Sequence, residues 1–215
     1  MTKVKSWSNS VLNLYEQCAF KYMCEKVAKI ASPESYHLSK GLAAHNVAEQ
    51  FLLGKIEDVP YELTKFTKEF RKLRELGAKP EEAFVLDSDW RHIPDGWRAK
   101  NAWLRLKLDA RIGNYVVDFK TGKHYDDHIH QAKLYANAMM MVDSSYDEIE
   151  VEFWYLFTGN VKSYVFTRDN LETDIAQWEE RVEKMHNDII FEPKPNEYCK
   201  YCHVRDICPA QDKLL

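Results

Sequence analysis

The sequence has few of the residues that mark fibrous, disordered or low-complexity chains. Its 215 residues include only 7 glycines and 7 prolines, whereas 45% are hydrophobic and 13% are aromatic. This composition excludes a disordered or collagen-like chain, because enough apolar surface is present to offset the entropy lost on folding. We expect residues 1–215 to form a single folded domain with a core of its own.

Long hydrophobic runs are missing as well. The longest apolar stretch lies around Ala136 to Val142 and is far short of the roughly 18 to 20 residues that span a bilayer. Residues 1–10 include lysines but no apolar segment of the kind found in export signals. We therefore expect a soluble, cytoplasmic protein with no membrane partner.

Cysteine is scarce, and its count of five is odd. A reducing cytoplasm does not favour a disulfide framework, so metal ligation is the better interpretation. Cys199, Cys202 and Cys208 lie within ten residues of one another, and Cys18 is a candidate fourth ligand. Four cysteines suit zinc or an iron-sulfur cluster, and their spacing does not decide between the two. Free thiols are the third alternative. Cys24 is the spare, expected to be a buried apolar residue.

No charge of one sign dominates the chain. Thirty Lys and Arg stand against 34 Asp and Glu, for a net charge of -4, so the overall balance does not indicate nucleic acid. Residues 64–80 differ, because their basic side chains outnumber the two acidic ones. These basic residues are Lys65, Lys68, Arg71, Lys72, Arg74 and Lys79. The segment is either a nucleic-acid contact or the solvated face of a helix.

Apolar spacing predicts a mixture of helices and strands. Helical spacing is found over about 8–18, 39–53, 64–77, 126–141 and 175–189, with Gly54, Gly77 and Pro80 as stop signals. Strict alternation predicts a strand over 104–112, followed by a Gly113-Asn114 turn and a return strand over 115–120. A second hairpin is expected over 149–157 and 161–166, around Gly159-Asn160. The fold class is therefore α/β.

The first hairpin brings two carboxylates together. With Gly113-Asn114 as its loop, Asp109 faces Asp118 and Lys107 faces Lys120. Cross-strand Cβ atoms are about 4.5 to 5.5 Å apart, so two ionised carboxylates repel each other unless a cation lies between them. The pair fits a divalent metal site, or a surface ladder of salt bridges with basic neighbours.

These residues form part of a wider resemblance. Asp109 with Asp118-Phe119-Lys120 resembles the metal-binding core of the PD-(D/E)XK nuclease superfamily. Gly41-Leu42-Ala43-Ala44-His45 resembles the GxxxH motif of its RecB-like branch, and Gln131-Ala132-Lys133-Leu134-Tyr135 resembles the QxxxY motif. The terminal cysteines are similar to the iron-sulfur ligands of the AddB nuclease domain and of small CRISPR-associated or phage exonucleases. GxxxH and QxxxY are weak patterns alone, but the order of all these elements makes the resemblance specific.

The resemblance implies a restriction-endonuclease-like mixed β-sheet flanked by helices. Residues 1–30 and 191–215 would together form the cluster-binding part of a single nuclease domain. The implied ligands of Mg²⁺ or Mn²⁺ are His45, Asp109, Asp118 and the backbone carbonyl of Phe119. The implied ligands of a 4Fe-4S cluster, with zinc as the lesser fit, are Cys18, Cys199, Cys202 and Cys208.

The resemblance also assigns catalytic roles. Lys120 is expected to orient the attacking water and to offset charge on the phosphate. Gln131 and Tyr135 share a helix face, where they position that water or the DNA, or form an ordinary polar pair beside the core. Glu82 is a candidate ligand for a second metal, whereas His124, His128 and His130 receive no role.

The function implied is that of a metal-dependent DNA nuclease, an exonuclease of recombination, repair or phage DNA processing. Linear, end-bearing or single-stranded DNA is the expected partner, with Lys65, Lys68, Arg71 and Lys72 as its contacts. A recombination protein, a single-strand-binding protein or a second copy of the chain would supplement binding by this acidic protein. The expected location is a bacterial, archaeal or phage-infected host cytoplasm. The alternatives are a non-catalytic nucleic-acid-binding protein and a zinc-stapled scaffold with a nuclease-like fold.

Overall fold

The computed structural model describes residues 6–33, 36–94, 96–122 and 128–213. The chain divides into two compact units, one made of residues 35–172 and the other of residues 1–34 with 173–215. Each unit is described by itself. Within the described residues, no helix combines the length and apolar character that a membrane crossing requires.

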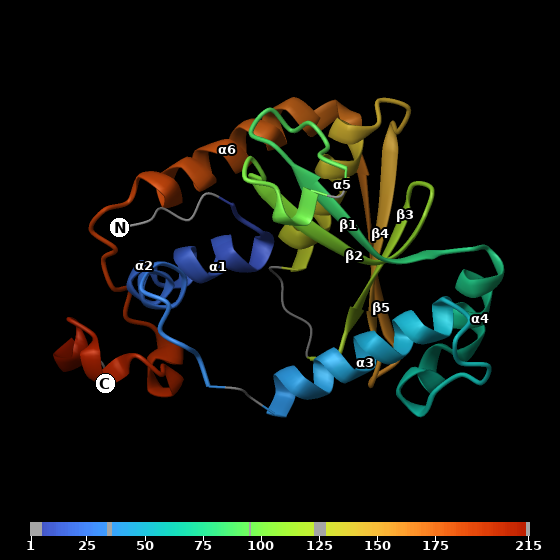
Figure 1. The fold of residues 1–215 in the computed structure, drawn as a ribbon, viewed down its shortest axis with the longest axis horizontal. Coiled ribbons are helices and arrows are strands. Elements are labelled where there is room, and N and C mark those ends of the chain that lie inside the picture. The colour runs from blue at the N-terminus through green and yellow to red at the C-terminus, as the bar shows by residue number, and fades with distance from the viewer. Residues whose placement is uncertain (1–5, 34–35, 95, 123–127, 214–215) are drawn as a thin grey trace. The chain divides into compact units, whose positions relative to one another are not determined.

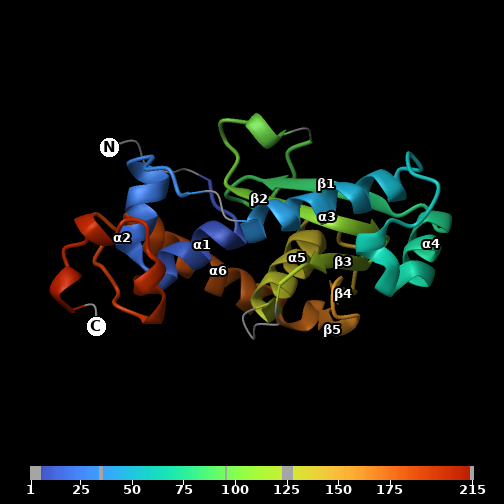
Figure 2. The same cartoon turned by 90° about the horizontal axis from the view of Figure 1, so that it is seen from below.

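A five-stranded mixed sheet forms the centre of the unit 35–172 (Figure 1). Its strands, β1 (Lys79–Leu86), β2 (Leu104–Ile112), β3 (Tyr115–Lys120), β4 (Glu148–Tyr155) and β5 (Asn160–Thr167), lie in sequence order. All neighbours are antiparallel except β3 and β4. That parallel pair needs a crossover, which includes α5 (His128–Val142), and Figure 2 shows α5 beside β3 and β4. The predicted α/β class with a mixed, helix-flanked sheet is confirmed.

Both predicted hairpins are present. In the first, Ala110, Arg111 and Ile112 pair with Val117, Val116 and Tyr115, which is the predicted register. Strand β1 was not predicted, because Pro80, Glu81 and Glu82 interrupt the alternation ahead of the short apolar run 83–86. Pro80 lies inside this edge strand, so the prediction that it stops the preceding helix was wrong, whereas Gly77 does end it with a φ of 70°.

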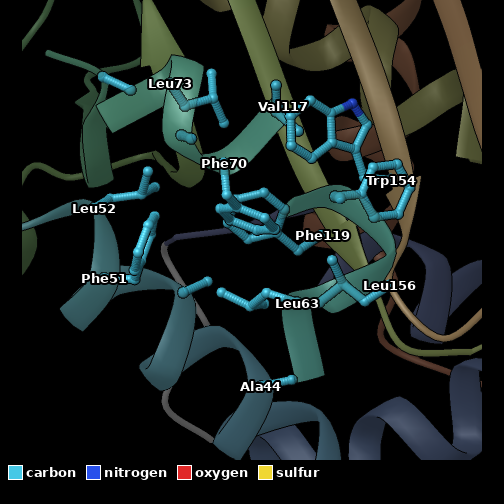
Figure 3. Close-up of a cluster of buried hydrophobic side chains, with 14 residues drawn as sticks. Ala44, Phe51, Leu52, Leu63, Phe70, Leu73, Val117, Phe119, Trp154 and Leu156 are labelled. Carbon is cyan, nitrogen blue, oxygen red and sulfur yellow. The ribbon is translucent and has the colours of Figure 1, made fainter. Parts of the chain in front are cut away.

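One face of the sheet is covered by α3 (Tyr36–Leu52), by a 3₁₀ turn η2 (Tyr61–Phe66) and by α4 (Thr67–Glu75). Phe70 of α4 lies at the centre of the cluster, between Phe51 of α3 and the sheet residues Phe119 and Trp154 (Figure 3). Its ring centroid is 5.0 Å from that of Phe119, and Phe66 stacks on Trp154 at the same distance. Each buried aromatic contributes roughly 1.5–3 kcal/mol, which fixes α3 against the sheet.

The other unit joins segments from both ends of the chain. It contains α1 (Asn9–Gln17), α2 (Ala19–Tyr22), a π-helical turn η1 (Met23–Val27) and most of α6 (Leu171–Asn187). The 3₁₀ turns η5 (Glu197–Tyr201), η6 (Arg205–Ile207) and η7 (Gln211–Lys213) belong to this unit, whereas η3 (Gly96–Arg98) and η4 (Arg168–Asn170) belong to the unit 35–172.

Two details of the helices in this unit differ from the prediction. The side chain of Ser8 caps α1, but the helix ends at Gln17, and Cys18 has extended backbone between two helices. Helix α6 ends at Asn187, so Ile189 lies beyond the helix and is 81% exposed. The apolar residues of its buried stripe are Trp178, Val182 and Met185.

Polar contacts tie the two chain segments together within this unit. The Arg181 guanidinium donates two hydrogen bonds of 2.8 Å to the Glu16 carboxylate. The Tyr15 hydroxyl donates to Asp188 Oδ2 at 2.9 Å, and Trp7 packs on Trp178 with ring centroids 5.9 Å apart. The Arg181–Glu16 ion pair is bidentate and partly buried, so it fixes the relative orientation of the two side chains as well as neutralising their charges.

Candidate metal and nuclease site

Helix α3 supplies the histidine of the site. Ala44, Ala48 and Phe51 are buried along one stripe, which leaves His45 at the edge of that stripe. Its Nδ1 lies 3.0 Å from Asp109 Oδ1 on β2. Gly41, one turn earlier, lies so close to Thr121 that an added Cβ would be 3.1 Å from the Thr121 Oγ1. A glycine at this position therefore lets the helix approach the end of β3.

The hairpin supplies the two opposed carboxylates. Asp109 is 9% exposed and Asp118 is 3% exposed. Among the described residues, the β2–β3 ladder runs no further toward them than the pair Ala110–Val117. Asp109 Oδ2 accepts a 2.7 Å hydrogen bond from the Phe119 backbone N–H. A side chain thus replaces the next ladder partner. Among the described residues, neither the predicted Asp109–Asp118 pair nor the predicted Lys107–Lys120 pair occurs in the ladder.

The Gln and Tyr of α5 bind the second carboxylate. Asp118 Oδ1 accepts hydrogen bonds from Gln131 Nε2 at 2.9 Å and from the Tyr135 hydroxyl at 3.0 Å. Gln131 Oε1 accepts from Lys120 Nζ at 2.8 Å, and Lys120 Nζ lies 2.7 Å from Asp118 Oδ2. The two α5 residues therefore orient both the carboxylate and the lysine.

Glu81 is the site residue that the sequence prediction missed. It lies on β1 with a φ of 53°, a left-handed conformation that is uncommon for a non-glycine residue. Ligand atoms of Glu81, His45 and Asp109 all lie within 4.8 Å of one another. Glu82, the predicted second-metal candidate, instead forms a bidentate ion pair with Arg111 and does not line the pocket. The placement of Glu81 depends on a backbone twist that the sequence does not reveal.

These side chains line one pocket between α3, β2, β3 and α5. Its lining residues are Gly41, Leu42, His45, Glu81, Lys107, Asp109, Asp118, Phe119, Lys120, Thr121, Gly122, Gln131 and Tyr135. The structure thus brings together His45, Asp109, Asp118, Phe119, Lys120, Gln131 and Tyr135, all named from the sequence. His128 lies elsewhere, with its Nδ1 2.9 Å from the Tyr155 hydroxyl, and His124 lies outside the described residues.

The electrostatics of the pocket favour a cation. Burial raises the pKa of Asp109, and the nearby charge of Asp118 raises it further. Burial disfavours a charged His45, but the hydrogen bond and the charge of Asp109 outweigh that effect, so the pKa of His45 lies above its usual value. Burial raises the pKa of Tyr135 well above its usual value, so its hydroxyl keeps its proton and remains a donor.

The donor set fits a divalent ion. An imidazole and two carboxylates converge within 4.8 Å, and Asp118 lines the same pocket with its Oδ2 2.7 Å from Lys120 Nζ. Oxygen ligands with one imidazole suit Mg²⁺ or Mn²⁺. His45, Glu81, Asp109 and Asp118 are the side chains that would hold such an ion.

The basic residues predicted to contact DNA lie away from this pocket. Lys65 is on η2, and Lys68, Arg71 and Lys72 are on α4, all of them exposed. The opposite side of α4 buries Phe70 and Leu73 in the core. The segment is therefore an amphipathic helix with a basic outer face.

The cysteines lie in the other unit. Cys18, Cys199, Cys202 and Cys208 line one small pocket, together with Lys21, Pro193 and Arg205. Among the described residues, no three of the cysteine sulfurs lie within 4.8 Å of one another. Cys24 is 1% exposed, and burial, with the neighbouring Cys202, Cys18 and Cys208, raises the pKa of its thiol. The prediction that Cys24 is buried is confirmed.

Comparison with known proteins shows the family. The family model of the PD-(D/E)XK nuclease superfamily matches residues 6–115 and 105–209, which is most of the chain. The chain therefore belongs to the PD-(D/E)XK nuclease superfamily, whose members are metal-dependent nucleases that bind nucleic acid.

A solved structure supports the fold. The crystal structure of SSO0001 is similar over 98% of this chain and 89% of that chain, with a TM-score of 0.50 and 17% sequence identity. At this identity the likeness concerns the fold alone. No curated protein matches the sequence.

Proposed function

We propose that this protein is a Mg²⁺- or Mn²⁺-dependent deoxyribonuclease of the RecB-like branch that hydrolyses phosphodiester bonds from DNA ends. The observation that carries this proposal is the convergence of His45, Glu81, Asp109 and Asp118 on a pocket that also holds Lys120. Carboxylates that have no catalytic or ligand-binding role normally lie on the protein surface, where water solvates them. Here two of them are almost fully buried.

The chain's own residues divide the work of such a reaction. A bound divalent ion supplies Lewis acidity toward a phosphate oxygen and lowers the pKa of a water. Asp109 is held in place by the Phe119 N–H and by His45, and Asp118 by Gln131 and Tyr135. These contacts fix the ligands before any ion arrives, which reduces the reorganisation that binding requires.

Lys120 is the second chemical group of the proposal. Its ammonium is held by Gln131 Oε1 and Asp118 Oδ2 and lies over the Phe153 ring, 5.0 Å from the centroid. In that position it can orient a water and neutralise charge that develops on the phosphate. The carbonyl of Phe119 as a further ligand stays a prediction, supported by the place of Phe119 in the pocket wall.

Mutation of the hairpin tests the activity. Asp118→Asn and Lys120→Ala are expected to reduce cleavage at least about 100-fold, because each removes a ligand or a stabilising charge. The measurement is product formation from end-labelled linear DNA, with circular DNA as the comparison and either ion present. Lys162→Ala on the exposed β5 is the matched control and should cleave like wild type.

The outcomes separate the candidate functions. Products from linear but not from circular DNA support an exonuclease, and cleavage of both indicates an endonuclease. If wild-type protein cleaves neither form with either ion, the non-catalytic scaffold is the better description.

A 4Fe-4S cluster on Cys18, Cys199, Cys202 and Cys208 is part of this proposal. Its support is the shared pocket of these four cysteines, which Cys24 does not line. A zinc ion bound by thiolates at about 2.3 Å needs sulfurs roughly 4 Å apart, whereas a cuboidal cluster is larger and holds its ligands further apart. The resemblance of these terminal cysteines to those of the AddB nuclease domain favours iron-sulfur over zinc.

The partners belong to the proposal as well. DNA would contact Lys65, Lys68, Arg71 and Lys72, which form an exposed basic face on an otherwise acidic chain. Roles in recombination, repair or phage DNA processing follow from the branch that the motifs resemble. A single-strand-binding partner or a homo-oligomer would compensate for the net charge of -4.

A further inference from the structure

An ion pair in the wall of the pocket has no role in the mechanism above. The ammonium of Lys107 on β2 contacts the carboxylate of Glu81 on β1. The Glu81 side chain is 15% exposed, whereas that of Lys107 is 52% exposed. Lys107 lies two residues before Asp109 on the same strand, and both residues line the pocket.

The two lysines of the pocket are held differently. Lys120 is 19% exposed, and its ammonium contacts both Asp118 and Gln131. Among the described residues, Lys107 has Glu81 as its ion-pair partner and no hydrogen bond to another side chain. A half-exposed lysine on a flexible four-carbon stem changes position at little cost, because water solvates its charge in either place.

Lys107 and a divalent ion compete for the same carboxylate. Glu81 lies within 4.8 Å of the ligand atoms of His45 and Asp109, so it belongs to the donor set of the ion. An ammonium on that carboxylate supplies the positive charge that the ion would otherwise bring. Binding of the ion through Glu81 therefore requires Lys107 to move.

We propose that Lys107 is a displaceable internal cation that holds Glu81 until a divalent ion binds and then contacts a nucleic-acid phosphate. The inference rests on the proposed function, because that function identifies nucleic acid as the molecule that the released lysine contacts. A released ammonium remains in the wall of the pocket, which Lys120 also lines. The ion and the nucleic acid then both favour the released position, so each raises the affinity of the other.

Metal titration of the free protein tests the competition. Isothermal calorimetry with Mn²⁺ in the absence of DNA compares wild type with Lys107→Met and Lys107→Gln. Both variants are expected to bind the ion about three- to tenfold more tightly, since a competing cation has been removed. Lys107→Arg should stay near wild type, as should the exposed Lys162→Met control. Unchanged or weaker binding in both neutral variants would overturn the proposal.

Nucleic-acid binding tests the second position of the lysine. In a Lys120→Ala background, which keeps the DNA intact, the affinity for a labelled single-stranded oligonucleotide is measured with and without Mn²⁺. We expect the ion to strengthen binding, and Lys107→Met to reduce that gain about threefold or more. If Mn²⁺ increases the oligonucleotide affinity equally in the proteins with Lys107 and with Lys107→Met, the release of Lys107 is contradicted.

The calorimetric result does not depend on catalysis. If wild-type protein binds Mn²⁺ more weakly than Lys107→Met but cleaves no DNA, the proposed function fails while the competition at Glu81 stands. If cleavage is normal and the neutral variants bind the ion like wild type, the nuclease stands and this inference fails. Circular dichroism of each variant confirms that its fold is unchanged.

Discussion

Each acidic side chain of the pocket has its charge held by a different set of groups. Asp109 uses a histidine and a backbone N–H, Asp118 uses a lysine, an amide and a phenol, and Glu81 uses Lys107. Three buried or half-buried negative charges so close together would otherwise destabilise the fold. The polar network is therefore as much a condition for folding as for binding an ion.

Arg111 and Glu82 form a structural ion pair outside the pocket lining. Burial would raise the pKa of Glu82, but the hydrogen bond and charge of Arg111 outweigh burial and lower it. The pair stabilises the fold fully above the pKa of an unfolded glutamate, about 4.3, and loses its contribution as the pH falls through the lower folded value.

Glu82→Gln is expected to lower the free energy of unfolding by about 1–2 kcal/mol at pH 7, because Arg111 loses a bidentate partner. The difference from wild type should shrink as the pH falls below about 4.3. Urea unfolding measures this difference in the free energy of unfolding at pH 7, 5 and 4, and at lower pH if the protein stays folded. The exposed Glu57→Gln is the control. A difference that is constant over this range would contradict the role of the ion pair.

The sequence predicts most of the site residues but not the hydrogen bonds and ion pairs that connect them. Asp109, Asp118 and Lys120 follow from the hairpin, and the GxxxH and QxxxY motifs add His45, Gln131 and Tyr135. Glu81 escapes because its neighbour Glu82 is chemically identical, and the β1–β2 register together with the left-handed backbone at Glu81 determines which of the two enters the pocket. A local twist of this kind depends on tertiary contacts that no spacing rule contains.

Among the elements, the most predictable are those with strict periodicity. The alternation over residues 104–112 and the Gly113-Asn114 turn predict β2, β3 and their register correctly. The same rules predict a ladder that continues to Asp109 and Asp118, whereas the backbone N–H of Phe119 bonds to the Asp109 side chain. Strand β1 is missed because a proline and two glutamates hide an edge strand.

Helix α4 is the element to which we assign a role in DNA affinity as part of the proposed function. If its outer face contacts phosphates, reversing Lys68, Arg71 and Lys72 to glutamate removes about three contacts. The slope of log binding constant against log salt should then become shallower by about 2 to 3, at roughly 0.9 per lost contact with duplex DNA. Fluorescence anisotropy at several salt concentrations measures this slope, and Lys162→Glu is the single-charge control. An unchanged slope would make these residues a solvated helix face.

At the scale of the whole molecule, the two units differ in how they are connected. The unit that holds the candidate site is one continuous stretch, 35–172, whereas the other unit needs residues 1–34 and 173–215 together. In the sequence, only Cys18, as the candidate fourth ligand beside the C-terminal cysteines, indicates that the two end segments lie together. The hydrogen bonds from Arg181 to Glu16 and from Tyr15 to Asp188 have no such signal, because isolated polar residues carry no periodic pattern.

A cluster in that unit would close a loop of about 180 residues and so constrain the unfolded chain. Cys18→Ser is therefore expected to lower both the iron content and the melting temperature of anaerobically purified protein. Cys24→Ser should change the iron content little, since Cys24 does not line the shared pocket. Metal analysis, visible absorption and thermal melting measure these effects. Colourless wild-type protein with stoichiometric zinc would contradict the iron assignment, and equal loss in the two variants would contradict the four-cysteine set.

The joining of both chain segments in one unit also decides how the protein responds to mechanical force. Tension applied between residues 6 and 213 passes through the contacts that link α1 to α6 and to the tail, among them the bonds from Arg181 and Lys194 to Glu16. Residues 35–172 form a loop that branches off this path, so they carry no load until those contacts break. A single-molecule stretching experiment should show two ruptures in a fixed order, with the candidate nuclease unit always unfolding second.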